Sequence, residues 1–133
     1  MKKPEWVLPE TALAIHERLL AEFGGLSGVR DQGGLESALA RPQQLFHYGK
    51  CSPFDLAAAY AFGIVRNHPF FDGNKRLGLT VAILFLELNG YRFAASEAEA
   101  TLKTLALAAS DLDQAGDAAW LKKNSRRNKP PRV

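Results

Sequence analysis

Nine consecutive residues, 68–76, bring together the kinds of side chain that phosphate chemistry requires. The segment reads His-Pro-Phe-Phe-Asp-Gly-Asn-Lys-Arg. Histidine titrates near neutral pH, so His68 is the candidate general base. Asp72 supplies a carboxylate, and Mg²⁺ is commonly held by one or two carboxylates together with phosphate oxygens and water. The pair predicts a base and a metal ligand on one tight loop.

The residues around Asp72 also predict a phosphate site. We expect a helix to begin near Gly73 or Asn74, and a helix N-terminus presents unpaired N–H groups and partial positive charge. Gly73 lets backbone approach a ligand closely, and Lys75 and Arg76 add two cations. Cations oppose the macrodipole at this end of a helix, so a bound anion explains them best. A competing role for Asp72 is that of the helix N-cap, and one residue can do both.

Other candidate residues are weaker. Arg66, one helix turn before the loop, is a candidate for a further phosphate or substrate contact. We expect His16 on the surface of the first helix and His47 in packing or in a helix-end contact, so neither enters the predicted site. Residues 25–34 form either a plain connector or a flap that positions a target, and both readings stay open. Five phenylalanines are most simply core residues: Phe62, Phe70, Phe71, Phe85 and Phe93.

The elements that position this segment are helical almost throughout, so we predict an all-α bundle. The residues before and after the loop predict two helices, 53–67 and one from 73 or 74 to 88, the second apolar nearly all round and therefore the buried central helix. His68 precedes a proline, which ends the first of these helices. Another helix is expected at 9–23. A short helix at 35–40 is expected to end at Pro42, with a second piece at 45–48. A Ser96–Glu99 capping box is expected to open a helix at 96–108, and the last helix is expected at 111–123. Residues 91–93 are expected to be extended.

Composition bounds the class of protein. The chain has 133 residues, 47% of them hydrophobic, which suits one globular domain. One cysteine, Cys51, excludes an internal disulfide and a cysteine-based zinc site. Neither a secretory signal nor a membrane span is evident, so we expect a cytoplasmic protein.

The net charge of +3 comes from one end of the chain. Residues 121–133 carry six of the 17 basic side chains and no acidic one, which leaves 11 basic against 14 acidic, or −3, for the rest. We therefore expect residues 1–121 to form the domain and 122–133 to be a basic, disordered tail. No aromatic residue interleaves the tail's charges, so we do not expect it to bind nucleic acid.

The nine-residue segment resembles the signature of the Fic/Doc family, His-x-Phe-x-(Asp/Glu)-(Gly/Ala)-Asn-(Gly/Lys)-Arg, at every fixed position. The similarity extends to residues 24–38 and 84–90 and is greatest to the death-on-curing (Doc) toxins of toxin–antitoxin systems. It covers about residues 11–121. The resemblance implies an all-α Fic/Doc fold whose active-site loop precedes a buried central helix.

The resemblance also separates two activities. Fic enzymes that transfer adenylate usually have glycine at the position of Lys75 and arginine at that of Thr80, whereas lysine is the Doc-type residue. It therefore implies a protein kinase that transfers the γ-phosphate of ATP to a serine or threonine hydroxyl, with Mg²⁺. Thr80 also departs from the asparagine expected in Doc. The alternatives are an adenylyltransferase using the same pocket and a catalytically silent binding module, which the presence of both His68 and Asp72 disfavours.

On this reading His68 takes the hydroxyl proton, Asp72 holds Mg²⁺, and Gly73 and Asn74 cradle phosphate while Lys75 and Arg76 neutralise charge. The resemblance implies a translation factor, elongation factor Tu, as the target. It also implies a partner antitoxin whose C-terminal segment folds into the active-site groove. The result would be a translation inhibitor.

Overall fold

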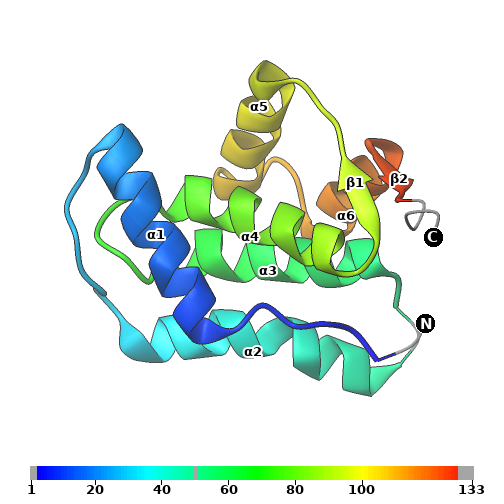
Figure 1. The fold of residues 1–133 in the computed structure, drawn as a ribbon, viewed down its shortest axis with the longest axis horizontal. Helices are drawn as coiled ribbons and strands as arrows, with labels where there is room; N and C mark the ends of the chain where they lie inside the picture. Colours follow the sequence, from blue (N-terminus) through cyan, green and yellow to red (C-terminus); the bar gives the residue numbers. More distant parts are fainter. Residues whose placement is uncertain (1–2, 50, 129–133) are drawn as a thin grey trace, which may run out of the picture.

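Helices make up most of the described part of the chain, residues 3–49 and 51–128, in a computed structural model of the protein (Figure 1). The helices are α1 (Pro9–Phe23), α2 (Gln32–Tyr48), α3 (Pro53–Asn67), α4 (Asn74–Leu88), α5 (Glu97–Ala108) and α6 (Gln114–Lys123). Two short strands, β1 (Tyr91–Phe93) and β2 (Ser125–Arg127), pair antiparallel. The predicted all-α class is confirmed. Among these residues no helix is long and apolar enough to cross a membrane.

The core lies around α3 and α4. These helices run in opposite directions side by side, with α2 packed on one side of α3 and α6 on another (Figure 1). The predicted central helix, α4, buries Leu77, Val81, Phe85 and Leu86. Close approach depends on a small residue, because a Cβ at Gly78 would lie 2.9 Å from Cγ2 of Val65 on α3. The loop between α3 and α4 is thereby held at one end of a rigid helix pair.

Three predicted helices begin and end where expected. Pro9 and Pro53 occupy the first turns of α1 and α3, where a missing N–H costs nothing. Gly24 ends α1, and α3 ends at Asn67, immediately before His68. The chain then enters α4 at Asn74. The residues flanking the candidate loop were therefore placed correctly from sequence.

The prediction for α2 was wrong. Instead of two pieces separated by Pro42, one helix runs from Gln32 to Tyr48 with Pro42 inside it and fully buried. A proline in a helix removes one hydrogen bond, but the complete burial of Pro42 offsets that loss. The helix also starts earlier than expected because the side chain of Asp31 accepts a hydrogen bond from the N–H of Gly34 and caps it.

The prediction of a disordered tail beginning at residue 122 was also wrong for residues 122–128. Helix α6 continues to Lys123, and β2 pairs with β1, with Arg126 opposite Arg92. The N–H of Ala94 donates to Asn124 and that of Asn128 to Gly90, which extends the pairing on both sides. A strand needs only backbone groups for this, so a basic composition does not prevent it. The rest of the tail, 129–133, lies outside the described residues.

The expected capping box at the start of α5 forms only in part. The Ser96 hydroxyl accepts from the N–H of Glu99 at 3.1 Å, as predicted. The Glu99 carboxylate does not return to Ser96 but accepts from Nε1 of Trp120 on α6, at 2.7 Å. Glu99 thus ties α5 to α6, and α6 begins at Gln114 rather than at 111.

Candidate active site

His68 stands at the C-terminal end of α3 in a left-handed conformation, with φ 50° and ψ 54°. Its N–H donates to the carbonyl of Ile64, which closes the helix. The guanidinium of Arg30 donates to the carbonyls of His68 and Asn67, at 2.8 and 3.1 Å. The side chain of His68 is exposed, whereas its backbone is held from two directions.

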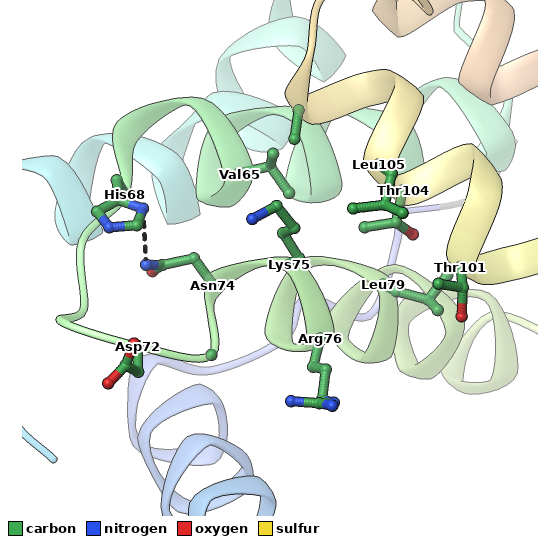
Figure 2. A pocket seen from close by; sticks show the side chains of 12 residues that line it. Val65, His68, Asp72, Asn74, Lys75, Arg76, Leu79, Thr101, Thr104 and Leu105 are labelled. Atoms are coloured by element: carbon green, nitrogen blue, oxygen red, sulfur yellow. Dashed lines mark hydrogen bonds between the residues drawn. The ribbon is translucent and has the colours of Figure 1, made fainter. Parts of the chain in front are cut away.

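Asn74 is the buried hub of the loop, with 4% of its surface exposed. Its Oδ1 accepts from the N–H of Phe70 at 3.0 Å, and its Nδ2 donates to the carbonyl of Phe70 at 2.9 Å. The same Nδ2 lies 3.0 Å from Nδ1 of His68 (Figure 2). Asn74 therefore holds the loop closed and orients the candidate base.

Asp72 does not cap α4, so the competing role considered for it does not hold. The N-cap is Gly73, with φ +81° and no side-chain hydrogen bond. Oδ2 of Asp72 instead accepts from the N–H of Leu26 at 2.6 Å. The backbone approaches this carboxylate closely, since a Cβ on Gly25 would lie 3.0 Å from Cβ of Asp72. The carboxylate is thus shared between the α4 loop and residues 24–31.

Residues 24–31 lie directly along the α3–α4 loop. Val29 and Phe70 form an isolated antiparallel bridge, and the N–H groups of Arg30 and Asp31 both donate to the carbonyl of Pro69. These contacts hold residues 24–31 against the candidate loop, an arrangement that both a packed connector and a flap can have. They do not test the flap's proposed role in positioning a target.

All the predicted site residues except Arg66 line one cavity of about 540 Å³. One side of it is formed by six residues of the predicted segment: His68, Asp72, Gly73, Asn74, Lys75 and Arg76. The opposite side is formed by residues of α3, α4 and α5: Val65, Leu79, Thr101, Thr104, Leu105 and Ala108 (Figure 2). The cavity therefore has a charged end and a largely apolar end, which suits a ligand with an anionic group and an apolar body.

The first turn of α4 supplies the positive charge. Helix bonding begins with the N–H of Leu77, which donates to Gly73, so the N–H groups of the preceding turn are not used within the helix. The side chain of Lys75 extends toward Val65 (Figure 2). The guanidinium of Arg76 rests over the ring of Phe23, 4.1 Å from its centroid. Cations and free N–H groups together fit a phosphate chain.

Arg66 does not join this group. It is absent from the cavity wall, and its guanidinium donates to the hydroxyl of Ser110 and lies 5.7 Å from the ring centroid of Phe62. Thr80 lies one turn beyond Arg76, and its hydroxyl donates to the Arg76 carbonyl at 2.7 Å. The structure gives neither residue a place at the charged end of the cavity.

Two placements of ring side chains were wrong. His16 is not a surface residue but is 2% exposed, and its ring stacks on that of Phe70 with centroids 3.7 Å apart. Phe71 is not a core residue but is 48% exposed. Phe70 fills the core position of the loop, so its neighbour must face outward. The periodicity of α1 could have shown His16 on the buried side, one turn from Ala12.

Sequence reasoning missed the α5 wall, including Thr101, Thr104 and Leu105. It recognised α5 as a helix, but nothing in its sequence showed which face would meet α4. The contact of Arg76 with the ring of Phe23 was also missed, because nothing in the sequence showed which residues of α1 would meet α4.

The site fits Mg²⁺ only as a partner of a bound phosphate. Among the described residues, no three histidine, cysteine or acidic side chains are grouped closely enough to hold a metal ion. Asp72 lines the cavity, and its Oδ1 is not used by a hydrogen bond within the described residues. Mg²⁺ often takes one carboxylate and completes its shell with phosphate oxygens and water, so Asp72 is the residue that would hold it.

Comparison with known proteins gives concordant matches. Residues 6–86 match the model of the Fic/DOC family. The chain is 36% identical over 85 residues to "Protein kinase doc" of Escherichia phage P1, and the aligned region covers 63% of this chain and 68% of the relative. It is 40% identical over 97 residues to "Toxin Doc" of Mycolicibacterium smegmatis, which covers 68% and 75%.

Proposed function

Because the chain belongs to the Fic/DOC family, we propose that it is a Doc-like toxin that transfers the γ-phosphate of ATP to a serine or threonine hydroxyl of a protein. The observation that carries this proposal is the cavity in which His68, Asp72 and the first turn of α4 meet. Relatives bearing the names "Protein kinase doc" and "Toxin Doc" support both the kinase and the toxin parts.

In the proposed reaction the target hydroxyl oxygen attacks the γ-phosphorus while the bond from that phosphorus to the β-bridging oxygen breaks. His68 takes the hydroxyl proton, and ADP leaves with the bridging electrons. Gly73 and Asn74 hold phosphate oxygens, and Lys75 and Arg76 offset the charge that moves to the leaving group. Mg²⁺, when bound through Asp72, would supply further charge neutralisation. Little covalent chemistry is asked of the protein, so positioning and electrostatics do most of the catalysis.

Lys75 favours phosphoryl over adenylyl transfer. It lines the cavity at the charged end, where its side chain occupies space and adds a charge beside the phosphates. Thr80 supplies no arginine that could grip a further phosphate, and its hydroxyl is bonded to its own helix. A nucleotide in the adenylylating orientation would lose that contact.

As target we propose a translation factor, elongation factor Tu, so that the modification inhibits translation. As partner we propose a separate antitoxin chain whose C-terminal segment folds over the cavity. Leu105 lines the cavity at 48% exposure and Leu102, on the same helix, is 67% exposed. Exposed apolar side chains at the rim of a site suit a covering peptide. A Leu102→Asp variant, changed outside the cavity wall, should then keep transfer and escape inhibition by the co-purified antitoxin.

The test uses purified protein, Mg²⁺, purified elongation factor Tu or a cell extract, and ATP labelled at the α- or γ-phosphate. His68→Ala removes the base, and His68→Asn removes it with a residue that tolerates the left-handed conformation. His47→Ala, at an exposed histidine of α2, is the matched control. We expect γ-label alone on the target, lost by at least about a hundredfold in both His68 variants.

Each other outcome points elsewhere. Transfer of α-label would make the protein an adenylyltransferase and would contradict the inference that Lys75 favours phosphoryl transfer. Binding of nucleotide without transfer of either label to any protein of the extract would favour the binding module.

A further inference from the structure

A second histidine, His16, lies beneath the loop that carries the candidate catalytic residues. It belongs to α1, far from that loop in the sequence, and is 2% exposed. Its Nε2 is 2.8 Å from the carbonyl oxygen of Asp72. Its ring stacks on Phe70 at 3.7 Å, with 19° between the planes. His16 therefore contacts the loop at two points without facing the cavity.

The hydrogen bond fixes which nitrogen of His16 carries the proton. A carbonyl oxygen can only accept, so Nε2 must donate. Burial makes the alternative costly, because the tautomer with its proton on Nδ1 would turn a lone pair toward that oxygen. The neutral ring is thus held as the Nε2–H tautomer.

The carbonyl of Asp72 and the N–H of Gly73 belong to one peptide plane. In a trans peptide these two groups point in opposite directions. When His16 binds the carbonyl, the N–H of Gly73 is turned away from His16. Gly73 lines the cavity and its N–H is one of the donors proposed to cradle phosphate. The orientation of a phosphate donor is therefore decided from α1.

Gly73 needs such a restraint. It has φ +81°, and glycine adopts positive and negative φ about equally readily, so the Asp72–Gly73 peptide is free to rotate on conformational grounds. The link from Leu26 to Asp72 restrains the side chain and not this peptide.

We propose that His16 is a positioning residue for the transfer reaction, which holds the Asp72–Gly73 peptide in the orientation that presents the Gly73 N–H to phosphate. His16 acts through the hydrogen bond from its Nε2 to the carbonyl of Asp72, and the stacking of its ring on Phe70 holds the ring in place for this bond. The role in transfer rests on the proposed function, whereas the orientation of the peptide does not.

Two variants separate the hydrogen bond from the packing. His16→Phe keeps an aromatic ring on Phe70 and removes the donor, and His16→Gln keeps an N–H donor at a similar reach. The exposed His47→Phe is the matched control. Backbone amide shifts of residues 72–76 are recorded without ligand, Kd is measured for Mg²⁺–ADP, and kcat and KM are measured for transfer from ATP.

His16→Phe should move the Gly73 amide resonance, raise Kd about tenfold and lower kcat/KM about tenfold or more, the worth of one net hydrogen bond. His16→Gln should stay within about threefold of the parent chain. If both variants lose thermal stability alike while the Gly73 resonance and Kd stay unchanged, His16 is a core residue only and the proposal fails.

A measurement on the unsubstituted protein guards against a variant that does not fold. Nitrogen-15 spectra of the imidazoles should show His16 as the Nε2–H tautomer, and its Nε2 resonance should shift when Mg²⁺–ADP is added. The Nδ1–H tautomer, or no response to bound nucleotide, would overturn the proposal. Absence of transfer in the unsubstituted protein would count against the kinase alone, since the ligand-free spectra need no reaction.

Discussion

The side-chain amide of Asn74 lies 3.0 Å from Nδ1 of His68, and its orientation is set by the backbone of Phe70. The N–H of Phe70 must meet Oδ1, and the carbonyl of Phe70 must meet Nδ2. The second hydrogen on Nδ2 then points at His68, so Nδ1 of His68 accepts and Nε2 carries the ring proton. In this arrangement Nδ1, the unprotonated nitrogen of His68, is hydrogen-bonded to Asn74. Binding of a phosphate oxygen to the Asn74 amide would free Nδ1 of His68.

We predict that Asn74→Asp reverses the tautomer of His68. An aspartate at this position still accepts from the N–H of Phe70 but turns an oxygen toward Nδ1, which then has to carry the proton. Nitrogen-15 imidazole spectra report the tautomer directly, and transfer from γ-labelled ATP should fall by about a hundredfold or more.

The control for this variant is Asn89→Asp. Asn89 also has a side-chain amide that bonds the backbone, to the carbonyls of Glu5 and Phe85, but it lies at the other end of α4. It should lose stability comparably and keep the His68 tautomer. An Asn74→Asp protein with the Nε2–H tautomer retained would contradict the assignment.

We predict that Gly25→Ala increases the distance between the backbone of residues 24–31 and the side chain of Asp72. The added methyl would lie 3.0 Å from Cβ of Asp72 and 3.2 Å from Cδ2 of Leu20, and Gly25 has φ +120°. The hydrogen bond from Leu26 to the Asp72 carboxylate should break, and the Mg²⁺ concentration for half-maximal transfer should change by several-fold. Transfer assays at graded Mg²⁺ measure this.

Gly24→Ala is the matched control, because Gly24 also has positive φ, +81°, and a Cβ there would meet nothing within 4 Å. It should show only the backbone penalty of a conformation with φ 81° and ψ −179°, about 1–3 kcal/mol in the free energy of unfolding. Equal Mg²⁺ dependence in the two variants would mean that the close approach to Asp72 has no functional consequence.

We predict that Lys75→Gly combined with Thr80→Arg moves transfer from the γ- toward the α-phosphate of ATP. Positions 76 and 80 are one helix turn apart, so an arginine at 80 would extend the row of cations beyond Arg76. Removing the Lys75 side chain frees space at the charged end of the cavity. The ratio of α- to γ-label on the target protein is the measurement. An unchanged ratio would show that these two residues do not set the orientation of the nucleotide.

The candidate active-site loop could be predicted from sequence because its residues are contiguous. A proline after His68 and a glycine before Asn74 determine locally where α3 ends and α4 begins. The links from His16 and Leu26 to Asp72 join residues distant in the chain, and nothing local in their sequence marks them. The strand conformation of residues 125–127 likewise depends on pairing with β1. A basic composition does not show that such pairing will form.

Asp117 in α6 is a buried carboxylate, 5% exposed. Burial raises the pKa of its carboxyl from 3.8 to about 6, against a smaller opposing effect of the nearby Lys103. Below about pH 4 the group is protonated in both folded and unfolded chains. Between about pH 4 and 6 the unfolded chain loses the proton first, so the stability of the folded state falls as pH rises, by up to about 3 kcal/mol.

Asp117→Asn should therefore raise the free energy of unfolding at pH 7.5 relative to the parent chain and lose most of this advantage near pH 4. Urea unfolding at the two pH values measures the difference, and comparison of variant with parent cancels the titration of other groups. The control is Asp111→Asn, an exposed carboxylate before the same helix, which should show no such dependence on pH. A gain that is equal at both pH values would come from packing, and burial of the Asp117 charge would not be its cause.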